Sequence, residues 1–394
     1  MNAFHNGLRR FCAWVIGLVF LSSGILKLMD PVGTSLIIGE YLKFFHLGFL
    51  SGASKLLGVV LAVLEAVTGA ALLTGVFRKV AAITASALIA LFTVITLILL
   101  IFNPEMDCGC FGEAIHLTHL QTFLKNVILL VLGVVAFIPF RDYGKPRKKR
   151  YAGFVLITAA LIAGVVYCWV YQPPVEFTAF TPGAELMASQ DNDYQALDGV
   201  TPTYIYEKDG RRASFPIGKL PDSTWTFVAV DTIAWNGIRQ SDEVPILSFT
   251  DSDGEYQDEL AVLGKVLVLS VYDTENASQK VWDRLSDLRE RVAGKGVTTI
   301  LLTPRGASVP DSFTEVYNAD YKTLVTLNRS NGGATWFDDG MLIRKWPWRY
   351  LPKEKELKRL QKFDPMDSMV QSVSRGRIRF HGFLLYLLAA LLLL

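Results

Sequence analysis

The stretch VAAITASALIALFTVITLILLIF, residues 80–102, is apolar from end to end and decides the fold class. Its length matches the roughly 20 residues with which an α-helix crosses a hydrocarbon core of about 30 Å. The chain has 394 residues and is 51% hydrophobic, because four further runs of this kind accompany the first. The five predicted membrane spans are residues 11–29, 56–77, 80–102, 120–140 and 151–171. A membrane α-helical protein is therefore expected.

Lys and Arg in short connecting segments predict how the spans are oriented. Basic residues lie at 9–10, 78–79 and 141–150, and five crossings place these segments on one side, the cytoplasm. Residues 103–119 contain neither Lys nor Arg and are expected outside. We predict a multi-pass protein of the bacterial inner membrane with a cytoplasmic N-terminus and an extracytoplasmic C-terminal domain. Membrane lipids are expected neighbours of the basic loop, and a net charge of only +2 indicates no nucleic-acid partner.

The chain becomes polar at Gln172, and a soluble region is predicted from there to about Pro365. Residues 202–206 and 224–231 are strand-like, with a hairpin turn at 209–210. Later predicted elements are a buried strand at 265–272 (KVLVLSVY), an amphipathic helix at 276–292, strands at 297–302 and 323–327, and a hairpin at 336–345. This order is typical of an α/β sandwich.

The α/β region, about residues 244–360, resembles the thioredoxin-like fold of extracytoplasmic thiol-disulfide proteins. That family carries Cys-x-x-Cys at the start of the helix, where this chain has Asn-Ala-Ser-Gln at 276–279. The cis-proline that precedes the family's hairpin has no counterpart between Val325 and Trp346. The resemblance thus implies a degenerate, cysteine-less thioredoxin-like domain, used for docking or support rather than for redox chemistry.

Hydropathy and these predicted elements divide the chain into five segments. They are a four-helix membrane domain (1–141), a basic cytoplasmic loop with a fifth helix (142–171), an extracytoplasmic β-rich segment (172–243), the degenerate thioredoxin-like domain (244–365), and a basic stretch with an apolar tail (366–394). As a helix, residues 380–394 of the tail would extend about 22 Å. The tail is therefore expected to be a short sixth helix or a membrane-inserted anchor.

The motif DCGCFG, residues 107–112, places Cys108 and Cys110 one glycine apart in the loop that is predicted to face outward. A redox couple, half of a metal site and a structural or incidental pair are the alternatives. Glycine supplies the backbone freedom that a very tight disulfide ring would need. A disulfide across one residue is strained, and it is therefore comparatively oxidising and easily exchanged. The pattern favours Cys108 and Cys110 as a catalytic redox couple.

Two histidines extend this motif to C-x-C-x5-H-x2-H. Cys108, Cys110, His116 and His119 would supply four side chains of the kind that bind Zn²⁺. His116 and His119 lie three residues apart and would share one face of a helix. The spacing is not that of a standard zinc finger, so metal binding is the alternative to the redox couple.

Among the polar residues within the predicted spans, three are candidates for a function. Glu65 is near the middle of the second span, Lys27 near the outer end of the first, and Asn126 near the outer end of the fourth. Polar and ionisable groups at such depths are costly and point to function by default. Glu65, Lys27 and Asn126 are therefore candidates for binding a cofactor such as a quinone. The alternative is an ion pair that locks two helices together.

Residues 22–31 (SSGILKLMDP), Glu65 with Gly69, and residues 108–112 (CGCFG) together resemble the DoxX-like membrane proteins. Within them the closest match is the branch of the methylamine-utilisation protein MauE, over about residues 10–140. The resemblance implies a four-helix DoxX-like bundle. It also implies a role in disulfide-dependent maturation of another protein, and nothing in this sequence indicates an amine substrate.

These observations lead to two functional hypotheses. The first is thiol-disulfide exchange or disulfide-dependent maturation through Cys108 and Cys110, with a membrane thiol-disulfide oxidoreductase activity. Its partner would be an extracytoplasmic thioredoxin-like protein or a client protein. The second is a non-catalytic membrane scaffold or assembly factor that recruits a client through its cysteine-less domain.

Overall fold

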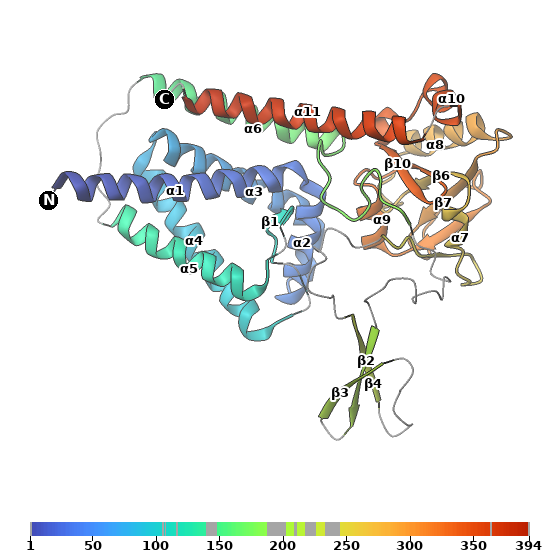
Figure 1. Cartoon of the computed structure of the whole chain (residues 1–394), viewed down its shortest axis with the longest axis horizontal. Coiled ribbons are helices and arrows are strands. Elements are labelled where there is room, and N and C mark those ends of the chain that lie inside the picture. Colours follow the sequence, from blue (N-terminus) through green and yellow to red (C-terminus); the bar gives the residue numbers. More distant parts are fainter. Residues whose placement is uncertain are drawn as a thin grey trace.

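The architecture combines a set of long apolar helices, a mixed α/β sheet domain and a separate small sheet (Figure 1). The computed structural model describes residues 2–104, 106, 108–115, 117–138, 148–186, 202–208, 211–216, 226–232, 245–362 and 365–392. The helices and the α/β domain meet at one end of the helices, where the short strand β1 (Cys110–Glu113) also lies.

Five helices of the described chain are long and apolar enough to cross a membrane, which confirms the five predicted spans. Their bounds as possible spans are His5–Met29, Gly48–Thr74, Arg78–Phe102, His119–Phe137 and Lys148–Val170. They correspond to α1 (Asn2–Met29), η1 (Gly48–Ala53) with α3 (Ser54–Thr74), α4 (Arg78–Phe102), α5 (His119–Phe137) and α6 (Lys148–Val170). The N-terminal region is therefore a helical membrane unit.

Small residues bring α1 and α3 together. A Cβ atom on Gly24 would lie 2.6 Å from the Ala66 backbone nitrogen, and one on Gly69 would collide with the backbone of Leu21. Close backbone approach through small residues is a common way for membrane helices to associate, because lipid provides no hydrophobic drive between them. Larger side chains at these two glycines would therefore separate the two helices.

A short helix, α2 (Pro31–Phe44), follows α1 directly. Pro31 occupies its first turn, where its fixed φ suits the helix and its missing N–H is not needed. The Asp30 side chain accepts a hydrogen bond from the Gly33 nitrogen at 2.9 Å and caps the helix. The sequence Asp-Pro thus ends α1 and starts α2, turning the chain across the end of the membrane unit.

The C-terminal domain is a six-stranded mixed sheet in the order β10-β9-β6-β7-β8-β5. Its strands are β5 (Phe249–Thr250), β6 (Lys265–Ser270), β7 (Thr298–Thr303), β8 (Val316–Ala319), β9 (Gly333–Asp338) and β10 (Met341–Trp346). Strands β6, β7 and β8 are parallel, and β9 and β10 form an antiparallel hairpin beside β6. Its helices are α7 (Glu259–Val262), α8 (Gln279–Val292), α9 (Tyr321–Leu327) and α10 (Glu354–Lys362). The predicted α/β sandwich order and closing hairpin are confirmed.

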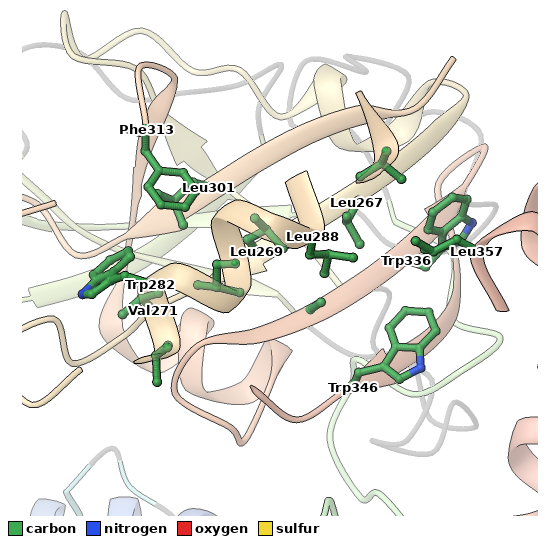
Figure 2. Close-up of a cluster of buried hydrophobic side chains, with 14 of the residues drawn as sticks. Leu267, Leu269, Val271, Trp282, Leu288, Leu301, Phe313, Trp336, Trp346 and Leu357 are labelled. Atoms are coloured by element: carbon green, nitrogen blue, oxygen red, sulfur yellow. The ribbon is translucent and has the colours of Figure 1, made fainter. Parts of the chain in front are cut away.

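Both faces of this sheet are buried, because successive side chains of a strand point to opposite sides. On one face Leu267 and Leu269 of β6 and Trp336 of β9 pack against Leu285 and Leu288 of α8 (Figure 2). The other face has its own core, formed by the following residues: Phe180, Phe249, Val266, Val268, Ile300 and Phe337. The continuous apolar run in β6 is the signature of such a doubly covered strand.

The segment after α6 contributes to this second core. Backbone hydrogen bonds join Gly183 to Leu342 of β10 at 2.7 Å and Leu186 to Gly340 at 2.9 Å. Together with the burial of Phe180, they extend the domain to residues that precede the small sheet. The α/β domain is therefore assembled from two separate parts of the chain.

The strand predicted at 323–327 is wrong, since Tyr321–Leu327 form helix α9 and the strand is β8, at Val316–Ala319. Asp320 explains the difference, because its side chain accepts hydrogen bonds from the nitrogens of Lys322 and Thr323 and caps a helix. A five-residue apolar run does not distinguish a strand from a buried helix by periodicity alone.

The small sheet has the order β3-β2-β4 and is antiparallel throughout. Its strands are β2 (Pro202–Lys208), β3 (Arg211–Pro216) and β4 (Thr226–Thr232). The strands predicted at 202–206 and 224–231 are confirmed, and the predicted turn at 209–210 lies outside the described residues.

The apolar tail continues a long helix, α11 (Pro365–Leu392), that runs beside α6 (Figure 1). Leu387 and Ala390 of α11 are buried in one cluster with Ile157 and Leu161 of α6. The tail is thus helical up to Leu392 and packs along a helix of the membrane unit, and its insertion into the membrane stays a prediction.

Candidate functional site

The two cysteines of the Cys-x-Cys loop lie at the end of the membrane unit, at the start of β1. Gly109 between them has φ +56° and Gly112 has φ +62°, in the left-handed region where glycine is preferred. A Cβ atom on Gly109 would also collide with Ile37 of α2. Cys108 is 4% exposed, Cys110 is half-buried, and neither forms a disulfide. The loop thus hides one thiol and leaves the other accessible.

Hydroxyl groups from two helices hold the backbone of this loop. Tyr41 of α2 donates a hydrogen bond to the Cys108 carbonyl, and Ser23 Oγ of α1 lies 2.7 Å from the Cys110 carbonyl oxygen. A bond of 3.1 Å from the Gly112 nitrogen to the Gly109 oxygen closes the turn. These contacts are made to the backbone of the loop and hold it in place.

The Cys108 sulfur has an imidazole as its neighbour. Cys108 Sγ lies 3.0 Å from His119 Nδ1, and His119 Nε2 lies 3.0 Å from the carbonyl oxygen of Pro104. A carbonyl can only accept, so Nε2 carries the hydrogen of the neutral ring and Nδ1 is free to take the thiol proton. His119 is the first residue of α5, which begins with a capping box between Thr118 and Gln121. The cap therefore holds the imidazole in place against the thiol.

Both residues of this thiol–imidazole pair belong to the motif C-x-C-x5-H-x2-H. The sequence pattern indicated His119 only as a possible metal ligand. Of the four possible ligands, His116 lies outside the described residues. Among the residues that the structure describes, no group of three or more His, Cys, Asp or Glu side chains could hold a metal ion. Metal binding by all four ligands stays a prediction from sequence, whereas the contact between Cys108 and His119 is direct.

Glu65 and Lys27 form a buried ion pair between α3 and α1. Lys27 Nζ is 2.8 Å from each Glu65 carboxylate oxygen, and the two residues are 7% and 1% exposed respectively. Ser23 Oγ lies 3.0 Å from Lys27 Nζ and 2.8 Å from Glu65 Oε2, as well as touching the Cys110 carbonyl. A hydroxyl has one proton, so Ser23 donates to the carboxylate or to the carbonyl, one at a time. The ion pair is thereby linked to the Cys-x-Cys loop.

Asn126 takes part in a different contact. Its amide nitrogen donates to the Phe92 carbonyl at 3.2 Å and to Thr96 Oγ1 at 3.1 Å, joining α5 to α4. The three cofactor candidates are therefore divided between an α1–α3 ion pair and an α4–α5 hydrogen bond.

The α/β domain contacts the same end of the membrane unit through Arg329, which follows α9. Arg329 Nη2 lies 2.8 Å from Asp30 Oδ2 and 3.5 Å from Glu113 Oε1, and the residue is 8% exposed. Asp30 caps α2, and Glu113 ends β1, three residues after Cys110. Sequence reasoning missed Arg329, because no local pattern marks a basic residue whose partners lie in another domain.

Five apolar helices, with an α/β domain and a Cys-x-Cys loop at one end, define a multi-pass membrane protein with an appended α/β domain. Residues 6–139 match the family model of methylamine utilisation protein MauE, so this part of the chain is similar to the membrane proteins of that family. Residues 200–234, which include the small sheet, match a domain of unknown function (DUF8463). No curated protein and no solved structure matches the chain.

Replacing Lys27 by Met should destabilise the protein strongly, because it leaves the Glu65 carboxylate buried without its cation. Breaking a buried pair on one side costs about 3–5 kcal/mol, whereas removing both charges is close to neutral. The variant with Lys27→Met and Glu65→Gln should therefore regain most of the lost stability. Thermal unfolding of the full chain in detergent, followed by tryptophan fluorescence, measures both changes.

The control for this cycle is Lys79→Met, which removes an exposed lysine at the start of α4. Surface substitutions of this kind change stability by roughly 0.5 kcal/mol or less. If Lys27→Met unfolds at the same temperature as the control, the ion pair does not hold α1 and α3 together.

Proposed function

We propose that the protein exchanges thiols and disulfides through Cys108 and Cys110. The observation that supports this most is the 3.0 Å contact between Cys108 Sγ and His119 Nδ1. The thiolate is the reactive form of cysteine, and a neighbouring imidazole is the usual group that generates it. A second thiol two residues away and partly exposed supplies the other half of a dithiol–disulfide couple.

The two thiols differ in solvent exposure, and we therefore assign them different roles. Cys110 is the more accessible, so its thiolate attacks a sulfur of the partner's disulfide, forms a mixed disulfide, and displaces the other partner sulfur as a thiolate. That thiolate takes up the proton that Cys110 lost. Cys108 then gives its proton to His119 Nδ1 and attacks Cys110 Sγ.

The second attack forms the Cys108–Cys110 disulfide and releases the remaining partner sulfur, which takes the proton from His119. The partner's disulfide is reduced to a dithiol, and the Cys-x-Cys pair is oxidised, with two electrons transferred. Run backward, the same steps oxidise a partner dithiol. The relative reduction potentials of the two couples set the direction.

We propose that the α/β domain is a thioredoxin-like docking module without redox chemistry. All four cysteines of the chain lie outside it, at 12, 108, 110 and 168. At the start of its α8, the Asp273 carboxylate accepts hydrogen bonds from the backbone and side chain of Asn276. Asn331 is bonded to both backbone groups of Asp273 at 3.0 and 2.7 Å. The place of the family's thiols is thus a hydrogen-bonded turn, beside the loop that carries Arg329.

We also propose that this end of the protein faces the extracytoplasmic side of a bacterial inner membrane. The basic residues at 9–10, 78–79 and 141–150 support this orientation through the charge rule. An oxidising compartment would allow the Cys-x-Cys pair to cycle. The contact of Arg329 with Asp30 and Glu113 supports a common side for the loop and the domain.

The stoichiometry of reaction with a small disulfide tests the redox proposal. In full-length protein with Cys12→Ala and Cys168→Ala, reduced Cys108 and Cys110 should release two thiols per chain from glutathione disulfide. Cys108→Ser should stop at the mixed disulfide and release one thiol, because no resolving sulfur remains. Cys110→Ser should react far more slowly, since Cys108 is 4% exposed.

His119→Asn should slow resolution on the order of 100-fold, the lower end of what a general base contributes. His46→Asn is the matched control, because His46 is exposed and its φ of +58° suits asparagine. Equal rates in the two histidine variants would remove the assigned role of His119. A double serine variant that still supports maturation of a client would favour the scaffold hypothesis.

Arg329→Gln tests the docking role of the α/β domain. Loss of the ion pair with Asp30 should slow exchange with a soluble thioredoxin in its disulfide form at least tenfold, because the module no longer holds its position at the loop. Exchange with glutathione disulfide should not change, since the small molecule needs no docking surface. The control is Arg305→Gln, at an exposed position of the same domain. Equal losses with both disulfides would mean that Arg329 acts on the thiols rather than on docking.

A further inference from the structure

A large cavity lies where the α/β domain meets the ends of α6 and α11. Its volume is about 1050 Å³, and α8, α10 and the N-terminal half of α11 contribute to its wall. Eleven of the residues described along this wall are Lys or Arg, and three are Asp or Glu. The cavity therefore carries an excess of eight positive charges.

The three acidic residues of the wall are already paired with three of the cations. Glu176 lies 2.6 Å from Lys345, Asp287 lies 3.0 Å from Arg291, and Glu356 lies 2.7 Å from Arg344. The excess comes from other residues, among them Arg375, Arg377 and Arg379 on three alternate positions of α11.

The pKa of Arg344 is affected by this excess of positive charge. Burial lowers the pKa of its guanidinium most, and the nearby Arg375, Arg359 and Arg379 lower it further, against the opposing effect of Glu356. Gathering so many like charges in one cavity is unfavourable unless an anion compensates for them. The cavity is thus chemically suited to an anionic ligand.

A second, apolar cavity adjoins the first. Its volume is about 560 Å³, and it lies between α1, α6 and α11, with walls that include Leu28, Ala163 and Phe383. Tyr167, Pro174 and Arg379 line both cavities. At this junction Arg379 donates a hydrogen bond of 2.9 Å to the Tyr167 hydroxyl. The cationic cavity therefore adjoins the apolar cavity, which lies between α1, α6 and α11 and is called the groove below.

We propose that the two cavities together bind one anionic membrane phospholipid, with its phosphate among the arginines and an acyl chain in the groove. Arginine forks match phosphate oxygens in pairs, and basic pockets between membrane helices suit anionic headgroups. A neutral quinone would leave the positive charge uncompensated, and free phosphate would leave the groove empty. The bound headgroup also accounts for three arginines that would otherwise contradict the charge rule on the proposed outer side.

Lipid binding to the full-length protein in detergent tests this site. Phosphatidylglycerol should bind at least tenfold more tightly than phosphatidylcholine with the same acyl chains, as measured by native mass spectrometry. Arg375→Gln with Arg377→Gln should reduce that affinity at least tenfold. The matched control is Lys280→Gln with Arg305→Gln, which removes two exposed cations of the α/β domain outside the cavity.

A second experiment tests whether an acyl chain of the lipid occupies the groove. Ala163→Phe fills the groove, so it should weaken phosphatidylglycerol binding at least tenfold and leave weak binding of inorganic phosphate unchanged. Ala159→Phe places the same side chain on an exposed position of α6 one turn earlier, outside the groove, and should change neither. Equal binding of the two lipids, or phosphate binding as tight as that of phosphatidylglycerol, would overturn the proposal. So would unchanged phosphatidylglycerol binding in the arginine or the Ala163 variant.

Discussion

The buried ion pair between Asp30 and Arg329 is the constraint on which the junction of the two domains depends. Asp30 does two things at once, because it caps α2 through the Gly33 nitrogen and accepts the guanidinium of Arg329. A Cβ atom on Gly33 would collide with the Asp30 carboxylate and approach Arg329 Nη2 to 2.9 Å. Two charges taken out of water are tolerated only in such well-defined geometry. The orientation of the α/β domain, the start of α2 and the place of Glu113 in β1 are all tied to this pair.

In the Cys-x-Cys loop the backbone makes the contacts that hold the loop in place, and the side chains carry the proposed chemistry. Its carbonyls are held by Tyr41 and Ser23, and its glycines supply the conformations that the turn requires. These hydrogen bonds are made to backbone carbonyls and so do not use the sulfur atoms that would change oxidation state. The imidazole of His119 is positioned in the same indirect way, by a helix cap and a carbonyl.

Much of the fold could be predicted from the sequence, because span length, strand alternation and turn residues are local signals. The strand placed at 323–327 failed because a short apolar run is ambiguous, and the decisive residue, Asp320, stands just outside it. In the site, the ion pair of Lys27 with Glu65 was one of two alternatives, and only the packing of α1 on α3 brings them together. The pairing of Cys108 with His119 was within the motif, yet four possible ligands look alike in sequence whether they hold a metal or move a proton. Arg329 had no local signal at all.

The position of α11 beside α6 has a mechanical consequence. The chain enters the α/β domain from α6 and leaves it into α11, and these two helices pack together along the apolar tail (Figure 1). A domain attached through one linker can rotate freely about it. A domain attached at both ends to two adjacent helices has fewer orientations open to it. Attachment at both ends therefore restricts the orientations that the α/β domain can take relative to the loop that contains Cys108 and Cys110.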